Sequence, residues 1–231
     1  MQQEQIKGGW SGSTLKLIAI TTMLLDHIGA ILLESNSPQM QTKEIQTLDF
    51  ILRLIGRVAF PLFIFLLLEG FEHTHNRKKY ALQLLVFGLL SEIPFDFALK
   101  GTWYDPSYQN VMFTLFLGYC AIWLYENFGE TDKRILLGVF ACIVLAHMLK
   151  TDYGAFGVLA IFLLYYTKKK KKYFYMTGVL LFFWEITAPI AFLLIRQYNG
   201  KRGLSLKYIF YFFYPVHILI LGLIRMFVLK C

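Results

Sequence analysis

The chain has 231 residues, of which 57% are hydrophobic and 16% are charged, and its mean hydropathy is +0.52. A soluble domain carries about 45–50% apolar and about 25% charged residues, so this composition excludes a soluble globular enzyme and a disordered chain. The formal net charge of +8 does not indicate nucleic acid as a partner, because no nucleic-acid-binding fold suits so apolar a chain. We therefore expect an integral membrane protein.

Eight apolar segments of the sequence approach the length of about 20 residues that a helix needs to cross a membrane. They predict an all-α bundle of about eight transmembrane helices that forms a single domain over residues 1–231. The segments are 14–33, 51–71, 79–98, 109–128, 134–150, 153–167, 173–195 and 207–229. The sixth segment is short and follows the fifth after a tight break at Thr151–Asp152, so these two form either a hairpin or a pair of half-helices.

The connections between these segments are short, and the longest runs from Glu34 to Phe50, so any chemistry must take place among the helices. Lys and Arg residues favour cytoplasmic loops. With the N-terminus inside, twelve of them lie in cytoplasmic segments and seven in outer loops, which predicts a multi-pass plasma-membrane protein with both termini in the cytoplasm. The loop 196–207 breaks the rule with four charges. Either the seventh segment does not cross fully, or this loop lies on the surface for another reason.

Ionisable side chains interrupt the apolar segments at similar depths. Such groups cost a few kcal/mol each in hydrocarbon, so they usually face a partner or a cavity and mark function. Six of them, from six different segments, are His27, Arg57, Glu92, His147, Glu185 and His217. We expect these side chains to point into the bundle and to surround one polar pocket in the outer half of the bilayer.

Lys16 and His27 lie on one stripe of the first helix. Their separation of eleven residues corresponds to about three full turns, or about 16 Å along the axis. A long ligand with an anionic head near Lys16 and a reactive end near His27 would fit this stripe, and the thioesters of coenzyme A have that shape. The three cysteines, Cys120, Cys142 and Cys231, show no metal-ligand spacing, and we expect no metal.

Several blocks of the sequence resemble the TraX family, whose namesake N-acetylates pilus subunits. The blocks are LKLIAITTMLLDHIGAIL, LRLIGRVAFPLFIFLLLEGF, RKKYALQLLVFGLLSEIPFDFAL, NVMFTLFLG, KTDYGAFGVL and YFFYPVHILI. The resemblance covers nearly the whole chain in the same order, and SEIPFD, KTDYG and YPVH are its most specific parts. A second, weaker resemblance is to the Arg-x10-His signature of membrane acyltransferases that O-acylate sugars. Ten residues separate Lys16 from His27 in the same way. Lysine replaces arginine here and offers a phosphate a point charge without bidentate geometry.

Both resemblances imply acyl transfer in the membrane from cytosolic acyl-CoA. The TraX resemblance implies acetyl-CoA as the donor and the N-terminal amine of a pilin or other exported peptide as the acceptor, whereas the other implies a hydroxyl. The expected catalytic residues are His27, Asp26, Arg57, Glu92, Glu185 and His217, and those expected to bind CoA phosphates are Lys16, Arg77, Lys78 and Lys79. His27 would act as general base or carry the acyl group. Asp26 or Glu92 would set its tautomer, and Arg57 would face the oxyanion.

Simpler interpretations exist for the same residues. His27 can be an interhelical hydrogen-bonding residue, Arg57 and Glu92 a buried ion pair, and Arg53 a snorkelling side chain. The lysines from Lys168 to Lys172 are most simply an anchor on anionic lipid. The main alternative function is a proton-coupled transporter, since buried Asp, Glu and His residues also relay protons. Transporters often contain internal repeats, and none is evident between residues 1–115 and 116–231. A scaffold protein would need no charged layer.

Overall fold

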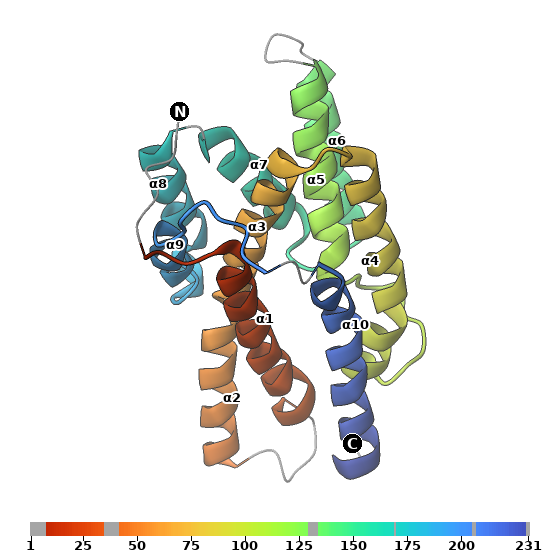
Figure 1. The fold of residues 1–231 in the computed structure, drawn as a ribbon. Helices are drawn as coiled ribbons and strands as arrows, with labels where there is room; N and C mark the ends of the chain where they lie inside the picture. Colours follow the sequence, from red (N-terminus) through yellow and green to blue (C-terminus); the bar gives the residue numbers. More distant parts are fainter. Residues whose placement is uncertain (1–7, 35–41, 129–133, 169, 205–206, 230–231) are drawn as a thin grey trace. The chain divides into compact units, whose positions relative to one another are not determined.

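The computed structural model describes residues 8–34, 42–128, 134–168, 170–204 and 207–229. Within these ranges the chain consists of helices joined by turns, without a β-sheet (Figure 1). The chain divides into two compact units. Unit 1 comprises Met1–Leu66, Pro94–Trp103 and Phe182–Cys231, and unit 2 comprises Leu67–Ile93 and Tyr104–Leu181.

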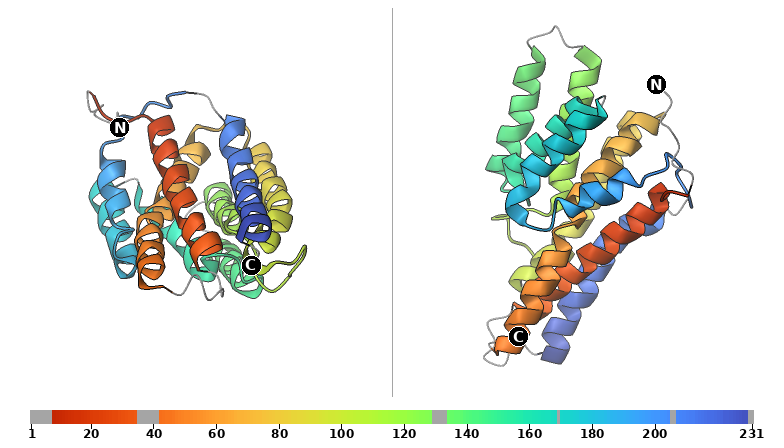
Figure 2. Two further views of the ribbon diagram at one scale, coloured as in Figure 1. Left: turned by 90° about the horizontal axis from the view of Figure 1, so that it is seen from below. Right: turned by 90° about the vertical axis from the view of Figure 1, so that its left-hand side faces the viewer.

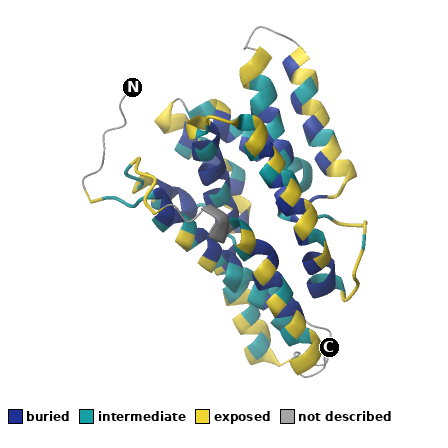
Figure 3. Cartoon of the chain, turned by 45° about the vertical axis from the view of Figure 1, so that its right-hand side comes forward, coloured by how far each residue is buried: buried dark blue, intermediate teal, exposed yellow. Residues whose placement is uncertain are grey.

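Five helical segments are long and apolar enough to cross a membrane. They are Gly12–Leu33, Lys43–His73, Arg77–Lys100 (α4), Val111–Phe128 (α5) and Tyr211–Leu229. Two further apolar helices, α6 (Arg134–Met148) and α7 (Gly154–Lys168), are shorter. Exposed and buried residues alternate along single helices (Figure 3), so large apolar side chains such as Leu89 and Leu136 face outward, where lipid suits them. The expectation of an all-α membrane bundle is confirmed.

The second apolar segment begins earlier than expected. Helix α2 (Lys43–Gly56) starts inside the stretch predicted as the longest connection, and α3 (Ala59–His73) continues it after a break at Arg57 and Val58. The Thr42 hydroxyl accepts a hydrogen bond from the Ile45 amide at 3.4 Å and caps the helix. Polar residues in the first turns of α2 hide it from a search for apolar runs.

The prediction that 173–195 forms one continuous span is wrong. The chain forms α8 (Lys171–Phe182), a 3-10 turn η3 (Phe183–Glu185) and the short helix α9 (Ile190–Arg196). Ile186 takes a φ of 54°, which β-branched residues rarely adopt. Pro189 has no N–H to donate to the Glu185 carbonyl, which instead accepts from the Thr187 amide at 2.5 Å. These two residues prevent a continuous helix from extending through residue 189.

In unit 1 the loop after α9 is bound to the start of α1 (Gly12–Ile28). The Trp10 amide donates to the Gln197 carbonyl at 2.8 Å, and the Gly12 amide donates to the Lys201 carbonyl at 2.8 Å. The loop thus receives amide donors that a helix N-terminus cannot satisfy within itself. Of the two alternatives for the loop 196–207, these bonds favour the first, that the seventh segment does not cross fully.

Helices α1 and α10 (Lys207–Ile224) lie parallel and side by side in unit 1 (Figure 2). Each ends in a π-helical turn, η1 (Gly29–Leu33) after α1 and η4 (Arg225–Leu229) after α10, and the two turns contact each other. Leu229 therefore lies at the opposite end of unit 1 from Trp10. Residues 1–7 and 230–231 lie outside the described ranges, and which membrane face each terminus occupies stays a prediction.

Unit 2 is built around α5, α6 and α7, which pack against one another. Their shared core consists of Leu117, Ala121, Ile135, Val139, Cys142, Ala146 and Val158. The turn between α6 and α7 contains three positive φ angles, 50° at Lys150, 61° at Tyr153 and 46° at Gly154. The expected tight break is thus confirmed, and of the two possibilities for this segment the helices form a hairpin.

Candidate functional site

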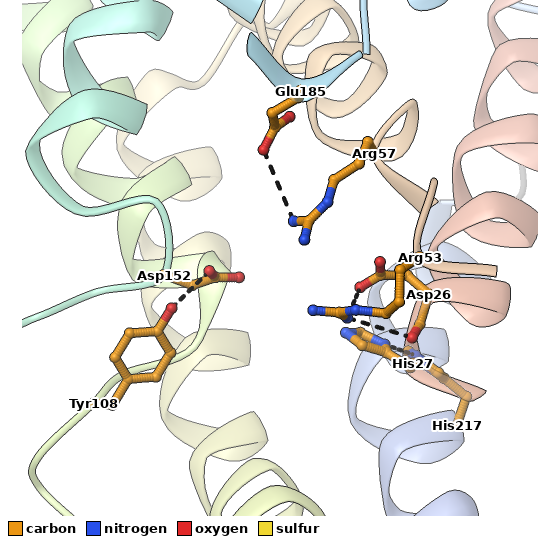
Figure 4. A network of polar contacts seen from close by, with 8 residues as sticks. All are labelled: Asp26, His27, Arg53, Arg57, Tyr108, Asp152, Glu185 and His217. Carbon is orange, nitrogen blue, oxygen red and sulfur yellow. Dashed lines mark hydrogen bonds and ion pairs between the residues drawn. The ribbon is translucent and has the colours of Figure 1, made fainter. Parts of the chain in front are cut away.

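Two histidines from opposite ends of the sequence meet in unit 1 (Figure 4). The Nδ1 atom of His27 on α1 lies 2.6 Å from the Nε2 atom of His217 on α10, and the rings are stacked with centroids 4.9 Å apart. His217 is only 6% exposed, whereas His27 is half-buried. The Nδ1 atom of His217 lies 2.6 Å from the Phe213 carbonyl one turn earlier, and its ring stacks on the Phe213 ring. The pair is thus anchored on the α10 side.

Asp26 and Arg53 form an ion pair between α1 and α2, next to His27 (Figure 4). The Nη1 atom of Arg53 donates to the Asp26 carboxylate at 2.7 Å. The two helices approach closely at glycines, since a Cβ at Gly29 would meet the Asp49 carboxylate at 2.7 Å and one at Gly56 would overlap Asp26. The sequence interpretation of Arg53 as a snorkelling residue missed this pair, because no spacing within one helix reveals a partner on another.

Arg57 and Glu185 form a second, looser ion pair in unit 1, with 3.8 Å between the Nη1 and Oε1 atoms. The Arg57 side chain is 35% exposed and that of Glu185 only 3%. Both residues stand at helix breaks, Arg57 between α2 and α3 and Glu185 at the end of η3. The ion pair expected between Arg57 and Glu92, which belong to different units, stays a prediction.

A hydrogen bond from Thr187 connects these two breaks. At the end of α2 the Val58 amide donates to the Ile55 carbonyl at 3.4 Å, rather than to Leu54 as a continuous helix would require. The Thr187 hydroxyl, two residues after Glu185, donates to the Leu54 carbonyl. Backbone groups released by a break inside a membrane need such a partner. The bond therefore fixes the segment that carries Glu185 against the one that carries Arg57.

Glu92 lies in unit 2 and organises the start of α5. Its Oε1 atom accepts hydrogen bonds from the Asn110 backbone amide at 3.0 Å and from the Asn110 side chain. The Asn110 side chain in turn donates to the Gly88 carbonyl at 2.9 Å and accepts from the Met112 amide at 3.0 Å, which caps α5. Glu92 thus has a structural role in its own unit. Its expected place beside His27, which belongs to unit 1, stays a prediction.

The structure differs from the sequence interpretation at two further places in unit 2. His147 is exposed near the end of α6, contrary to the expectation that it points into the bundle. A polar group that the sequence analysis did not single out lies near the following turn, where the Tyr108 hydroxyl donates to the Asp152 carboxylate at 2.8 Å and Thr114 bonds Thr151 at 2.8 Å. The KTDYG block was the available signal for it.

The residues expected to bind CoA are divided between the units. Lys16 is half-buried on α1, and because this helix is unbroken to Ile28 the stripe that joins it to His27 is kept, over about 16 Å. In unit 2, Lys78 and Lys79 are exposed at the start of α4, while the Arg77 guanidinium lies 4.4 Å from the centre of the Phe71 ring. Within the described ranges, no three His, Cys, Asp or Glu side chains are grouped to hold a metal ion.

These observations define a helical membrane protein with ionisable side chains gathered among the apolar helices of unit 1. The model of the TraX protein family matches residues 11–225, so the chain belongs to the TraX family. A probable fimbrial assembly protein FimC, serogroup H1, of Dichelobacter nodosus is 29% identical over 94% of this chain and 97% of its own length. An uncharacterised protein of Rickettsia prowazekii (strain Madrid E) is 26% identical over 49% of this chain and 37% of its own. No solved structure matches the chain.

Proposed function

We propose that the protein is an integral-membrane acetyltransferase that moves the acetyl group of cytosolic acetyl-CoA to the N-terminal amine of a pilin-like or other exported peptide. The observation that carries the proposal is the contact between His27 and His217 inside apolar helices, because a half-buried imidazole held by a second one is suited to proton transfer. Membership of the TraX family, which is linked to pilin acetylation, and the fimbrial assembly name of the Dichelobacter relative support the acceptor class.

The reaction needs one base and one group that stabilises negative charge. The acceptor nitrogen attacks the thioester carbonyl and loses a proton to His27 as the C–N bond forms. The C–S bond then breaks, and the proton passes from His27 to the departing thiolate, which leaves as the CoA thiol. Arg57, partly exposed beside Glu185, is the proposed partner of the oxyanion. Lys16 would hold a CoA phosphate by its positive charge.

The proposed orientation places the start of α1 in the cytoplasm of the producing cell, with the chain in its plasma membrane and in contact with lipid. The loop after α9 lies at that same end of unit 1, so four of the seven Lys and Arg residues first assigned to outer loops move to the inner face. This change strengthens the positive bias of the cytoplasmic side. In the same orientation the end of η4 faces outward.

The acceptor class can be tested with purified full-length protein in detergent micelles. We expect it to transfer the label of radioactive acetyl-CoA to a lysine-free synthetic peptide with a free N-terminal amine, and to release one CoA thiol for each peptide acetylated. The same peptide with a formylated N-terminus is the matched control and should receive no label. Folded protein that leaves the free peptide unlabelled, or that labels both peptides equally through hydroxyl groups, would refute an amine acceptor.

Lys16 should govern donor binding. We expect Lys16→Ala to raise KM for acetyl-CoA by about tenfold or more, since a hydrogen bond to a charged group contributes about 1.5–3 kcal/mol, and to change kcat little. Lys16→Arg should retain most of the affinity, because it keeps the charge. Leu17→Ala, at an exposed neighbour on the same helix, is the control. A fall in kcat with an unchanged KM would place the donor elsewhere.

A further inference from the structure

We infer that His217 is a positioning residue that fixes the tautomer of His27, so that the Nε2 atom of His27 is the base. The inference rests on the proposed function for the meaning of that base. The tautomer itself follows from geometry and can be measured without any acyl transfer.

The direction of each hydrogen bond follows from the Phe213 carbonyl. A carbonyl oxygen only accepts, so the Nδ1 atom of His217, at 2.6 Å, carries a hydrogen and donates it. In a neutral imidazole the other nitrogen then has a lone pair and accepts. The Nε2 atom of His217 lies 2.6 Å from the Nδ1 atom of His27, which must therefore donate. His27 is left with its lone pair on Nε2.

The packing of His217 makes this arrangement persistent. Its side chain is buried, its ring stacks on Phe213 with centroids 4.6 Å apart, and the neighbouring Tyr214 ring contacts both histidines. A flipped ring would place a carbon against the Phe213 carbonyl and leave a polar group without its bond in an apolar region, which is costly. The orientation of His217 is thus set by its own helix and imposed on His27.

The same chain of bonds can share the charge that appears during the reaction. When the Nε2 atom of His27 takes the acceptor proton, its Nδ1–H remains bonded to the Nε2 atom of His217. The proton between the two rings can move toward His217, so both imidazoles carry part of the positive charge. The adjacent residue Asp26 is paired with Arg53, so this ion pair brings no net charge to the surroundings of the two histidines.

Nitrogen-15 NMR of histidine-labelled, full-length protein in detergent micelles tests the tautomer directly. The His27 signals are assigned as those that His27→Gln removes. In the wild type we expect a protonated Nδ1 and a lone-pair Nε2 on His27. A wild-type spectrum with the hydrogen on the Nε2 atom of His27 would overturn the inference, whether or not the protein transfers acetyl groups, so the two proposals can fail separately.

Two substitutions separate positioning from packing. His217→Phe keeps a buried ring but removes the acceptor, so we expect loss of the fixed tautomer. We expect kcat to fall by at least about tenfold and at most by the 10²–10⁴-fold that a general base contributes, while KM for acetyl-CoA stays unchanged. His217→Gln can place an acceptor oxygen near the former Nε2 position and should keep the tautomer and most of kcat. If His217→Phe retains both, or if His217→Gln loses as much as His217→Phe, the inference is wrong. Should His217→Phe fail to fold, the wild-type spectrum and His217→Gln decide.

Discussion

Replacing His27 by alanine is expected to lower kcat for acetyl transfer by about 10²–10⁴-fold, the range that a general base contributes. The protein should remain folded, because His27 itself is only half-buried and the rings of Phe213 and Tyr214 continue to pack against His217. Binding of acetyl-CoA should persist, since the phosphates are expected to lie about 16 Å away along α1, near Lys16. Steady-state kinetics and calorimetric titration of the detergent-purified variant measure the two effects separately.

The matched control is His147→Ala, which removes an exposed histidine from α6 in unit 2. We expect near-wild-type kcat for this variant. Near-normal turnover in His27→Ala would show that His27 is only an interhelical hydrogen-bonding residue. An equal loss in both variants would mean that the assay reports on the general state of the protein rather than on the site.

Gly56→Ala is expected to destabilise unit 1 and to disturb the site. A Cβ at this position would overlap the Cβ and the carboxylate of Asp26, and those atoms lie too close to the α1 backbone to move aside. Helices α1 and α2 would have to separate, which would stretch the bond between Asp26 and Arg53 and displace His27 from His217. Overpacking of this kind costs about 1–3 kcal/mol. We expect a lower thermal unfolding midpoint in detergent and a loss of activity greater than the loss of folded protein.

Gly88→Ala is the control for that substitution. Gly88 also lies inside a helix, α4, but a Cβ there would meet the side chains of Met112 and Phe113 only at ordinary contact distances of 3.5–3.6 Å. Since alanine favours a helix by up to about 1 kcal/mol over glycine, Gly88→Ala should be neutral or stabilising. A Gly56→Ala protein as stable as Gly88→Ala would show that the close approach of α1 and α2 is not required.

The sequence predicts features that depend on local periodicity. The stripe joining Lys16 to His27 follows from the helical repeat alone, and α1 keeps it. The break at Thr151–Asp152 is visible as an interruption of an apolar run, and the chain turns there. The helical membrane class follows from composition, which is independent of how the helices are arranged.

Pairings between distant helices are not encoded in any local pattern. Depth along each segment brought His27 and His217 into one expected layer, but it did not identify which side chains in that layer touch. The contact between Arg57 and Glu185 depends on a break in 173–195 that comes from the conformation of Ile186 and from Pro189. A hydropathy window does not detect such a break, because the residues on both sides of it are as apolar as those of a true span.

The hydrogen bonds between the first and last parts of unit 1 have a consequence for biogenesis. The two histidines are separated by 190 residues in sequence, and the amides at the start of α1 are satisfied by carbonyls near residue 200. During synthesis α1 therefore enters the membrane before these partners exist. Its N-terminal amides and His27 lack them until almost the whole polypeptide has been synthesised. Completion of the site is a final step of assembly, since contacts of such long range form only after the chain between them exists. A nascent or truncated chain without its last helix would be inserted and yet inactive, so an incomplete copy would not consume acetyl-CoA.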